Sequence, residues 1–226
     1  MKKIFIFGVG TISDVVYHYL SEAQEYQIDG FVEYDELIAT KKKFGLPVVK
    51  SSDINKFFPP NIYEGFVAIG YKNYNIEREN AFKFLKEKNY SLCSYVSKKS
   101  VIAKNVIIGE NCLILENQTI QPYAKIKNNV YLWSGNHIGH HSTINENTFV
   151  SSHVVISGNC NIGKNCFIGV NATIADSIEI KNKCTIFMNA SVNKNLQEST
   201  MVVNKNSEII QSSDRKTKLL LNKFYK

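Results

Sequence analysis

A period of six residues runs through the second half of the chain. From Val96 to Val192 every sixth residue is Ile, Val or Leu, in seventeen consecutive positions without a slip. An α-helix repeats every 3.6 residues and a half-buried strand every 2, so neither explains the pattern. A period of six, with a β-branched residue at one site, predicts short strands joined by tight turns in a solenoid. Each aliphatic side chain then points into a narrow core.

The position four residues after each aliphatic is mostly small, as a second inward site near a corner requires. Four of the five cysteines occupy it, namely Cys112, Cys160, Cys166 and Cys184. They are predicted to be buried packing residues rather than a redox or metal set. Asparagine recurs where a turn tolerates the left-handed conformation. These positions are Asn105, Asn111, Asn117, Asn129, Asn147, Asn159, Asn165, Asn171 and Asn189.

The first 90 residues show a different pattern. A buried strand over Lys3–Phe7 is followed by the glycine turn GVG and by a helix, with Thr11 or Ser13 as its N-cap. A second apolar run, QIDGFVEYDE, ends in acidic residues, a third strand is expected over 65–70, and a helix over about 75–88. This β-α-β order predicts a small Rossmann-like sheet. Ser13 stands where the dinucleotide fingerprint has its third glycine, so a plain NAD site is not expected. The loop can still hold a phosphate at the helix N-terminus.

The repeat resembles that of the hexapeptide-repeat acyltransferases over about residues 96–197. The resemblance implies a left-handed parallel β-helix with three hexads per coil, a homotrimer, and acetyl-CoA bound between neighbouring β-helices. With GVG after the first strand and AIG (68–70) after the third, nearly the whole chain is similar to the sialic-acid O-acetyltransferases and the bacterial nucleotide-sugar N-acetyltransferases. The expected domains are a Rossmann-like nucleotide-sugar-binding domain (1–90), the β-helix (91–197), and a C-terminal cap (198–226) that ends in a short basic amphipathic helix.

The same resemblance implies the binding residues. The expected nucleotide-sugar contacts are Gly8, Gly10, Thr11, Glu33, Asp35, Gly70 and His153. For Gly8 and Gly10 a tight turn needed only for packing explains the residues equally well. The expected coenzyme A contacts are Gly158, Asn171, Asn189 and Lys205. Asn171 and Asn189 follow His153 at steps of eighteen residues, so the three are expected in one column along a corner. This column either lines the groove between subunits or is a solvated asparagine ladder that stabilises the turns. The Gly-x-Pro-Ala-Lys loop with which many relatives contact coenzyme A is absent from the sequence after the repeat.

Histidine is concentrated in one stretch, WSGNHIGHHS, which holds His137, His140 and His141 of only five in the chain. In the hexad register His140 and His141 follow the inward Ile138 and fall on the outer face of a turn. Zinc needs three or four converging ligands, which this spacing does not predict. A general base for acyl transfer fits better, because histidine titrates near neutral pH. The resemblance assigns that role to His140. It also reveals a departure, because His141 stands where the sugar N-acetyltransferases carry an acidic residue that orients the base.

These features favour an acetyl-CoA-dependent acetyltransferase that acts on a nucleotide-linked amino sugar for surface glycan synthesis. The proposed transfer is direct and requires no metal. Transfer to a sugar hydroxyl, a non-catalytic β-helix scaffold and metal-dependent lyase or hydratase chemistry remain as alternatives. The net charge of +7 suits an anionic ligand or only reflects a lysine-rich surface. Nucleic acid is not the expected partner. The sequence predicts no signal peptide and no membrane span, and a cytoplasmic location with reduced thiols.

Overall fold

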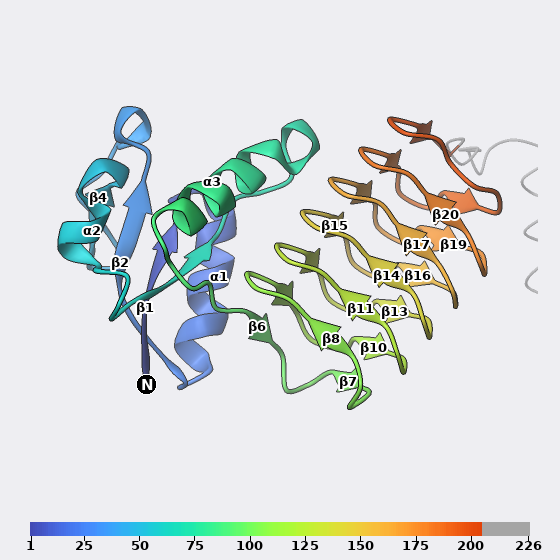
Figure 1. Ribbon diagram of the computed structural model, residues 1–226, viewed down its shortest axis with the longest axis horizontal. Helices are drawn as coiled ribbons and strands as arrows, with labels where there is room; N and C mark the ends of the chain where they lie inside the picture. Colours follow the sequence, from blue (N-terminus) through green and yellow to red (C-terminus); the bar gives the residue numbers. More distant parts are fainter. Residues whose placement is uncertain (205–226) are drawn as a thin grey trace, which may run out of the picture.

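The computed structural model describes residues 1–204. They form an α/β domain followed by a stack of coils (Figure 1). The amphipathic helix expected at the end of the chain falls, from Lys205 onward, outside the described residues. The elements of the α/β domain are β1 (Lys2–Phe7), α1 (Thr11–Glu22), β2 (Tyr26–Glu33), η1 (Asp35–Leu37), β3 (Lys42–Lys43), β4 (Leu46–Lys50), η2 (Ser51–Asp53), α2 (Ile54–Phe57), β5 (Glu64–Val67), η3 (Asn73–Asn75) and α3 (Ile76–Glu87).

The five strands form one sheet in the order β3-β4-β2-β1-β5. All pairs are parallel except the short β3–β4 pair at the edge. Side chains of β1 alternate between two cores, because successive residues of a strand point to opposite faces. Ile4 and Ile6 pack on the α1 side, whereas Phe5 and Phe7 pack on the side of α2 and α3. The Rossmann-like prediction is confirmed. The third strand is shorter than expected, since β5 ends at Val67.

Helix α1 begins differently from the prediction. Its N-cap is Gly10, and no side chain caps it. Thr11 is already the first helical residue, and the Ser13 hydroxyl donates back to the Gly10 carbonyl at 2.6 Å. The first-turn N–H groups therefore face outward from the end of β1 without a side-chain partner.

The second half is a parallel β-helix of two-residue strands, as the hexad period predicted. Its strands are β6 (Tyr95–Val96), β7 (Val101–Ile102), β8 (Ile107–Ile108), β9 (Leu113–Ile114), β10 (Thr119–Ile120), β11 (Lys125–Ile126), β12 (Tyr131–Leu132), β13 (His137–Ile138), β14 (Thr143–Ile144), β15 (Phe149–Val150), β16 (Val155–Ile156), β17 (Asn161–Ile162), β18 (Phe167–Ile168), β19 (Thr173–Ile174), β20 (Glu179–Ile180), β21 (Thr185–Ile186), β22 (Ser191–Val192) and β23 (Met201–Val202). Strands eighteen residues apart pair in parallel, as His137 does with Thr119 and Val155.

Three sheets and three corners make up each coil. The domain-facing sheet contains β6, β9, β12, β15, β18, β21 and β23, the second sheet runs from β7 to β22, and the third sheet from β8 to β20. We call the turn between the domain-facing and second sheets the first corner. The second corner joins the second and third sheets, and the third corner leads back. In one coil these corners are residues 133–136, 139–142 and 145–148.

The inward positions and the turns follow the sequence pattern closely. From Ile114 onward, the aliphatics predicted to point inward form one buried core with the four cysteines in register. Ile102 and Ile108 are only partly buried against it. The inward prediction is wrong for Val96, which is exposed because β6 is the edge strand of its sheet. Burial raises the pKa of the Cys112 thiol to about 11, so this thiol stays protonated at neutral pH. The corner residues three positions after each inward aliphatic have positive φ from Asn111 onward, and His141 (φ 59°) and His153 (φ 58°) are among them. Asn105 does not share this conformation.

The β-helix continues past the expected boundary at residue 197. Strand β23 pairs with β21, with Val202 opposite Ile186. Leu196 bridges to Ile180. Both steps are sixteen residues rather than eighteen, because the last turns are shortened. The hexad register ends at Val192 in the sequence, although the solenoid does not.

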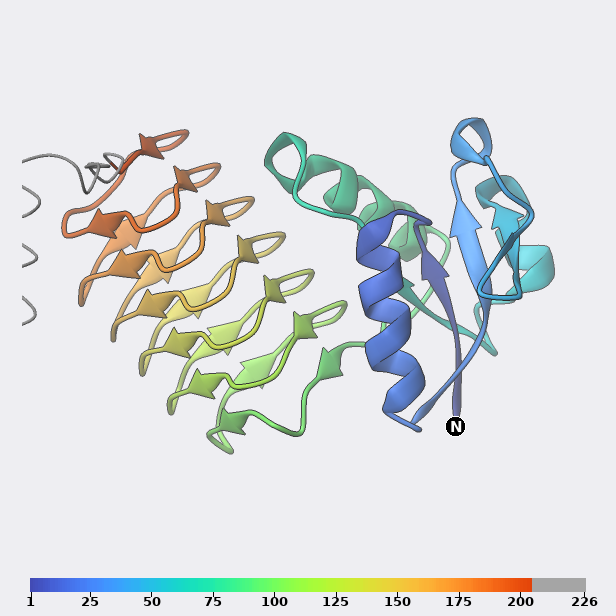
Figure 2. The ribbon, with the colours of Figure 1, turned by 180° about the vertical axis from the view of Figure 1, so that it is seen from behind.

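The α/β domain covers one of the three sheets. Leu113, Tyr131 and Phe149 of the domain-facing sheet pack into the same core as Ile4 and Ile6. The coils extend away from this junction, with α1 and α3 on the side of the α/β domain that faces them (Figures 1 and 2). The second corner is the corner that does not border the domain-facing sheet.

Candidate functional site

A cavity of about 680 Å³ opens at the carboxyl ends of β1 and β5. In a parallel sheet this is where ligands bind, because the chain crosses over to opposite sides there. The walls are the loop after β1, the end of β2 with η1, the loop after β5, and one β-helix side chain. The lining residues are Gly8, Val9, Gly10, Thr11, Ile12, Glu33, Tyr34, Leu37, Ala68, Ile69, Gly70, Tyr71, Lys72, Glu77 and Trp133. We call it the switch-point cavity.

The two glycines of the first loop differ in what they require. Gly8 has φ +114°, and a Cβ there would lie 2.8 Å from the Ala68 carbonyl oxygen. Its glycine is therefore fixed by packing and conformation. Gly10 has ordinary backbone angles, and a Cβ would meet nothing within 4 Å. Packing does not explain Gly10, which faces open space at the uncapped N-terminus of α1, where an anion is stabilised by the helix dipole and free N–H groups.

The two acidic residues after β2 have separate tasks. Glu33 lines the cavity and is 8% exposed. Its carboxylate accepts hydrogen bonds from the N–H groups of Val9 (3.2 Å) and Tyr34 (2.9 Å), so it holds the loop after β1 in place. Asp35 does not line the cavity. Its carboxylate accepts from the hydroxyl and N–H of Ser52, and these hydrogen bonds lower the pKa of Asp35.

The histidine pair stands on the second corner, and both side chains are exposed, as the register predicted. Nδ1 of His140 lies 3.1 Å from Nδ1 of His141. The His140 N–H donates to Gln121 Oε1 at 2.9 Å, and the His141 ring stacks on Tyr123 with 4.7 Å between centroids. With both Nδ1 atoms engaged with each other, Nε2 of His140 is the nitrogen left for chemistry.

Gly158 lies directly beneath this imidazole, one coil further along the same corner. A Cβ on Gly158 would lie 2.8 Å from His140 Nε2 and 2.9 Å from Asp176 Oδ1. The two side chains therefore approach the same point from opposite sides, one coil above and one below. The absence of a side chain at Gly158 leaves the space in which Nε2 stands.

The remaining predicted residues lie on the first corner. His153, Asn171 and Asn189 form one exposed column with positive φ, as their spacing predicted. The His153 ring lies over Gly135, where a Cβ would come within 2.6 Å of His153 Nδ1. Roles of this column in binding stay predictions. Lys205 lies outside the described residues. In one chain the first-corner column and the His140 pair stand on different corners.

Family models match both halves of the chain. Residues 3–85 match the PglD N-terminal domain. Residues 123–158 match the bacterial transferase hexapeptide of six repeats, and residues 159–194 match the hexapeptide repeat of succinyl-transferase. The α/β domain is therefore similar to the PglD N-terminal domain, and the β-helix is similar to transferase hexapeptide repeats. The family resemblance drawn from the sequence is confirmed, and no curated protein sequence matches the chain.

Solved structures share this two-part architecture. The acetyltransferase domain of PglB from Neisseria gonorrhoeae is 18% identical, with a TM-score of 0.79 over 89% of this chain and 96% of that one. A mutant of perosamine N-acetyltransferase from Caulobacter crescentus, in complex with CoA and GDP-perosamine, is 19% identical, with a TM-score of 0.81 over 92% and 98%. WeeI from Acinetobacter baumannii is 20% identical, with a TM-score of 0.71 over 90% and 97%. At these identities the likeness shows the fold.

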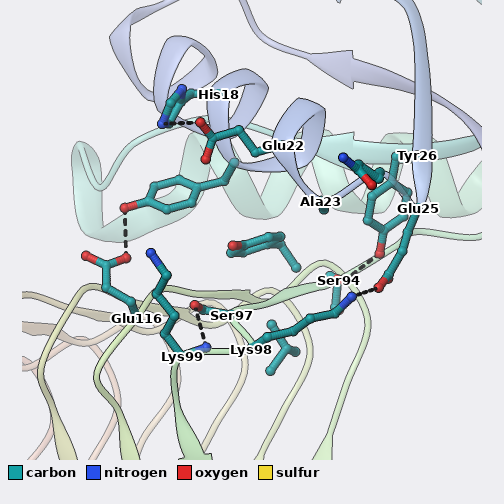
Figure 3. Close-up of a pocket in the computed structure, with 14 residues that line it drawn as sticks. His18, Glu22, Ala23, Glu25, Tyr26, Ser94, Ser97, Lys98, Lys99 and Glu116 are labelled. Atoms are coloured by element: carbon teal, nitrogen blue, oxygen red, sulfur yellow. Dashed lines mark hydrogen bonds and ion pairs between the residues drawn. The ribbon is translucent and has the colours of Figure 1, made fainter.

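A second cavity, of about 690 Å³, lies between the end of α1 in the α/β domain and the first β-helix coil (Figure 3). Glu22, Glu25 and Glu116 contribute carboxylates to it, and the carbonyl end of α1 faces it. Carboxylates and a helix C-terminus disfavour a phosphate. Lys98 pairs with Glu25 at 2.6 Å, so one of its two lysines is already neutralised. The switch-point cavity also contains two carboxylates, Glu33 and Glu77, but it adjoins the N-terminus of α1 rather than its C-terminus.

Arg78 of α3 joins the α/β domain to the third corner of the β-helix. The sequence did not predict this role of Arg78. Its guanidinium is fully buried. It donates to the Gly70 carbonyl (3.2 Å), to Asn75 Oδ1 (2.9 Å) and to the Asn147 carbonyl (2.7 Å), and its centre lies 4.4 Å from the Tyr131 ring centroid. Burial lowers the pKa of Arg78 to about 10, which leaves it charged at neutral pH. Through Gly70, this residue ties a wall of the switch-point cavity to the β-helix.

A buried asparagine ladder runs beside Arg78. Asn111 Nδ2 donates to Asn129 Oδ1, and Asn129 Nδ2 donates to Asn147 Oδ1, both at 2.8 Å. The ladder also reaches the sheet, because Asn111 Oδ1 accepts from the Val67 N–H at 2.7 Å. These residues were predicted as turn residues. Their added role at the domain junction depends on α3 and β5, which hexad spacing does not encode.

Two further features concern residues 1–204 as a whole. No three His, Cys, Asp or Glu side chains converge as a metal site would need. None of the helices in this part of the chain is long and apolar enough to cross a bilayer.

Proposed function

We propose that the protein transfers an acetyl group from acetyl-CoA to the amino group of a nucleotide-linked sugar, as a cytoplasmic step of surface glycan synthesis. One observation carries the proposal: a single chain holds both a phosphate-compatible cavity and an exposed imidazole with a free nitrogen on a transferase β-helix. The complex of perosamine N-acetyltransferase with CoA and GDP-perosamine supports it, because that enzyme has the same fold.

The switch-point cavity takes the nucleotide. Its diphosphate lies at the N-terminus of α1, against Gly10 and Thr11, where N–H groups and the helix dipole stabilise negative charge. Lys72 lines the same cavity and adds a positive charge. The net charge of +7 raises the local concentration of such an anion.

His140 is the general base. This role requires the tautomer in which Nδ1–H of His140 donates to His141 Nδ1, 3.1 Å away, and Nε2 carries the lone pair. Nε2 removes a proton from the sugar amine as the nitrogen attacks the acetyl carbonyl. The C–S bond then breaks, coenzyme A leaves as a thiolate, and the imidazolium gives its proton to that thiolate. A Cβ at Gly158 would lie 2.8 Å from Nε2, so glycine at this position keeps that nitrogen unobstructed.

A homotrimer completes the site. In one chain His140 occupies the second corner, whereas the switch-point cavity borders the domain-facing sheet and the first corner. A neighbouring copy that sets its second corner against this first corner brings His140 to the sugar. His153 and the column of Asn171 and Asn189 then line the groove for coenzyme A.

The test is thiol release from acetyl-CoA with UDP-, dTDP- and GDP-linked amino sugars and with their hydroxyl counterparts. We expect turnover on an amino sugar, and a kcat lower by about 10²- to 10⁴-fold in His140→Asn. His18→Asn, an exposed histidine on α1, is the matched control and keeps full activity. Turnover on hydroxyl sugars alone would assign O-acetylation. Silence across the panel, with folded protein, would refute the proposal in favour of a binding scaffold.

A further inference from the structure

Trp133 is the only β-helix residue among those that line the switch-point cavity. It is also the only tryptophan of the chain. All the other lining residues belong to the α/β domain, so the cavity crosses the domain junction at this one side chain.

The sheet order fixes where Trp133 stands along the cavity. The ends of β2, β1 and β5 lie side by side in that order. Beyond β5, Tyr71 packs on Phe149 and Phe167, with centroids 4.9 and 4.7 Å apart, and Trp133 packs on Phe149 at 6.1 Å. Trp133 therefore belongs to the β5 end, and Tyr34 and Leu37 belong to the β2 end.

The backbone of Trp133 is held firmly. Its N–H donates to the Val150 carbonyl at 2.9 Å in the β-helix ladder. Its carbonyl accepts hydrogen bonds from the side-chain amides of Gln118 and Asn136. The backbone that carries the indole is therefore fixed before a ligand arrives, so binding there does not require the ordering of a loop.

A diphosphate at the centre of the cavity separates the two ends of a nucleotide sugar. The phosphates sit at the loop after β1, at the N-terminus of α1. The nucleoside and the sugar must then extend in opposite directions. Tyr34 and Leu37 at the β2 end suit the nucleoside, as the second strand does in doubly wound sheets. The sugar extends toward β5 and the β-helix.

We infer that Trp133 is the sugar-binding wall, on which the apolar C–H face of the hexose packs against the indole. This rests on the proposed function and adds to it the direction of the substrate. The sugar leaves the α/β domain at the first corner, beside the His153 column, with its acceptor group toward a neighbouring subunit.

The single tryptophan provides a direct binding assay. We would titrate the wild-type protein with a nucleoside diphosphate and with its amino-sugar derivative, and follow tryptophan emission alongside calorimetry. The sugar derivative is expected to change the emission clearly, while the diphosphate binds with little change. Trp133→Ala should lower the affinity for the sugar derivative about fivefold to tenfold, and the affinity for the diphosphate less than about twofold. Trp133→Phe, which keeps an aromatic face, should recover most of the affinity.

Leu37→Ala is the matched control at the other end of the cavity, since Leu37 is 59% exposed and its loss leaves the core intact. The Leu37→Ala variant should lower the affinities for both ligands by the same factor. Equal emission changes with both ligands, or equal losses in Trp133→Ala, would overturn the inference and place the nucleoside on Trp133. Normal turnover with unchanged emission would overturn it while the proposed function stands. Failure of both ligands to bind, without turnover, would refute both.

Discussion

At the scale of single residues, Nδ1 of His140 faces a second imidazole nitrogen, Nδ1 of His141. Two Nδ1 atoms 3.1 Å apart share one proton, so one ring must donate and the other accept. Tyr123 stacks on His141 and limits its rotation. The sequence suggested that His141 could not orient the base as an acidic residue would. The structure assigns the partner of His140 Nδ1 to His141 itself.

Substitutions of His141 test this arrangement. Asparagine tolerates the left-handed backbone at this position (φ 59°) and offers a side-chain oxygen as acceptor. Alanine offers no acceptor and strains the turn. We expect His141→Asn to retain a substantial part of the kcat and His141→Ala to lose more than about tenfold. Steady-state kinetics on the same sugar would check this, and equal kcat values for the two variants would contradict it.

Gly158 makes a second prediction at this scale. Its alanine variant puts a methyl group 2.7 Å from His140 Cε1 and 2.9 Å from Asp176 Oδ1. Both neighbours are side-chain ends on an outer corner, so they move and the coil stays intact. We expect Gly158→Ala to reduce kcat at least about tenfold, because a base displaced by an ångström loses its alignment. The melting temperature should change little, and an unchanged kcat would show that Nε2 is not the reacting atom.

At the scale of elements, Arg78 connects α3 to two coils without a carboxylate partner. Replacing it with methionine leaves the carbonyls of Gly70 and Asn147 buried and unpaired. Each such group costs about 1–3 kcal/mol, so Arg78→Met should lower the free energy of unfolding by about 3 kcal/mol or more. Thermal unfolding would measure it. Lys83→Met is the matched control on the same helix, because its exposed pair with Glu79 contributes little. Equal losses of unfolding free energy in Arg78→Met and Lys83→Met would contradict the stabilising role of Arg78.

Glu116 links α1 to the first corner and predicts a pH effect. It accepts hydrogen bonds from Tyr19 Oη (2.8 Å) and Ser134 Oγ (2.7 Å). Burial alone would raise the pKa of Glu116, but the hydrogen bonds from Ser134 and Tyr19 outweigh it and lower the pKa. A lowered folded-state pKa adds stability above the unfolded pKa of about 4.3, and this is lost as the pH falls through the folded value. Glu116→Gln should therefore destabilise the protein at pH 7 and much less at pH 3. Equal destabilisation at both would contradict it.

The sequence predicted the repeating elements well because each hexad carries its own local signal. Ile138 and Cys160 are inward and His140 and His141 outward, as their positions require. Features that depend on distant contacts were missed. Arg78 lies in the polar segment IERENAFK and would be expected on the surface, yet its acceptors come from coils far along the chain. Trp133 fits the hexad register, and only the docking of the α/β domain makes it a cavity wall.

At the scale of the whole molecule, the two parts of the proposed site face different ways. The α/β domain borders the domain-facing sheet, and its polar contacts with the β-helix include Glu116 on the first corner and Asn147 on the third. The second corner, which carries His140, borders neither the α/β domain nor the domain-facing sheet. The cyclic trimer proposed above would set each second corner against the first corner of the next subunit. Light scattering should therefore give three times the 25.7 kDa chain mass.

Mixed trimers test whether two subunits share one site. His140→Asn removes the base and leaves the cavity intact. Gly10→Phe fills the cavity without a backbone clash, because a Cβ at Gly10 meets nothing within 4 Å. Each variant alone should be inactive. Co-expressed with different tags and purified through both, the mixed trimers contain one interface in three at which an intact cavity meets an intact His140. We expect about one third of the wild-type activity per trimer. If one chain supplied both parts, every site would carry a defect and the mixed trimers would stay inactive.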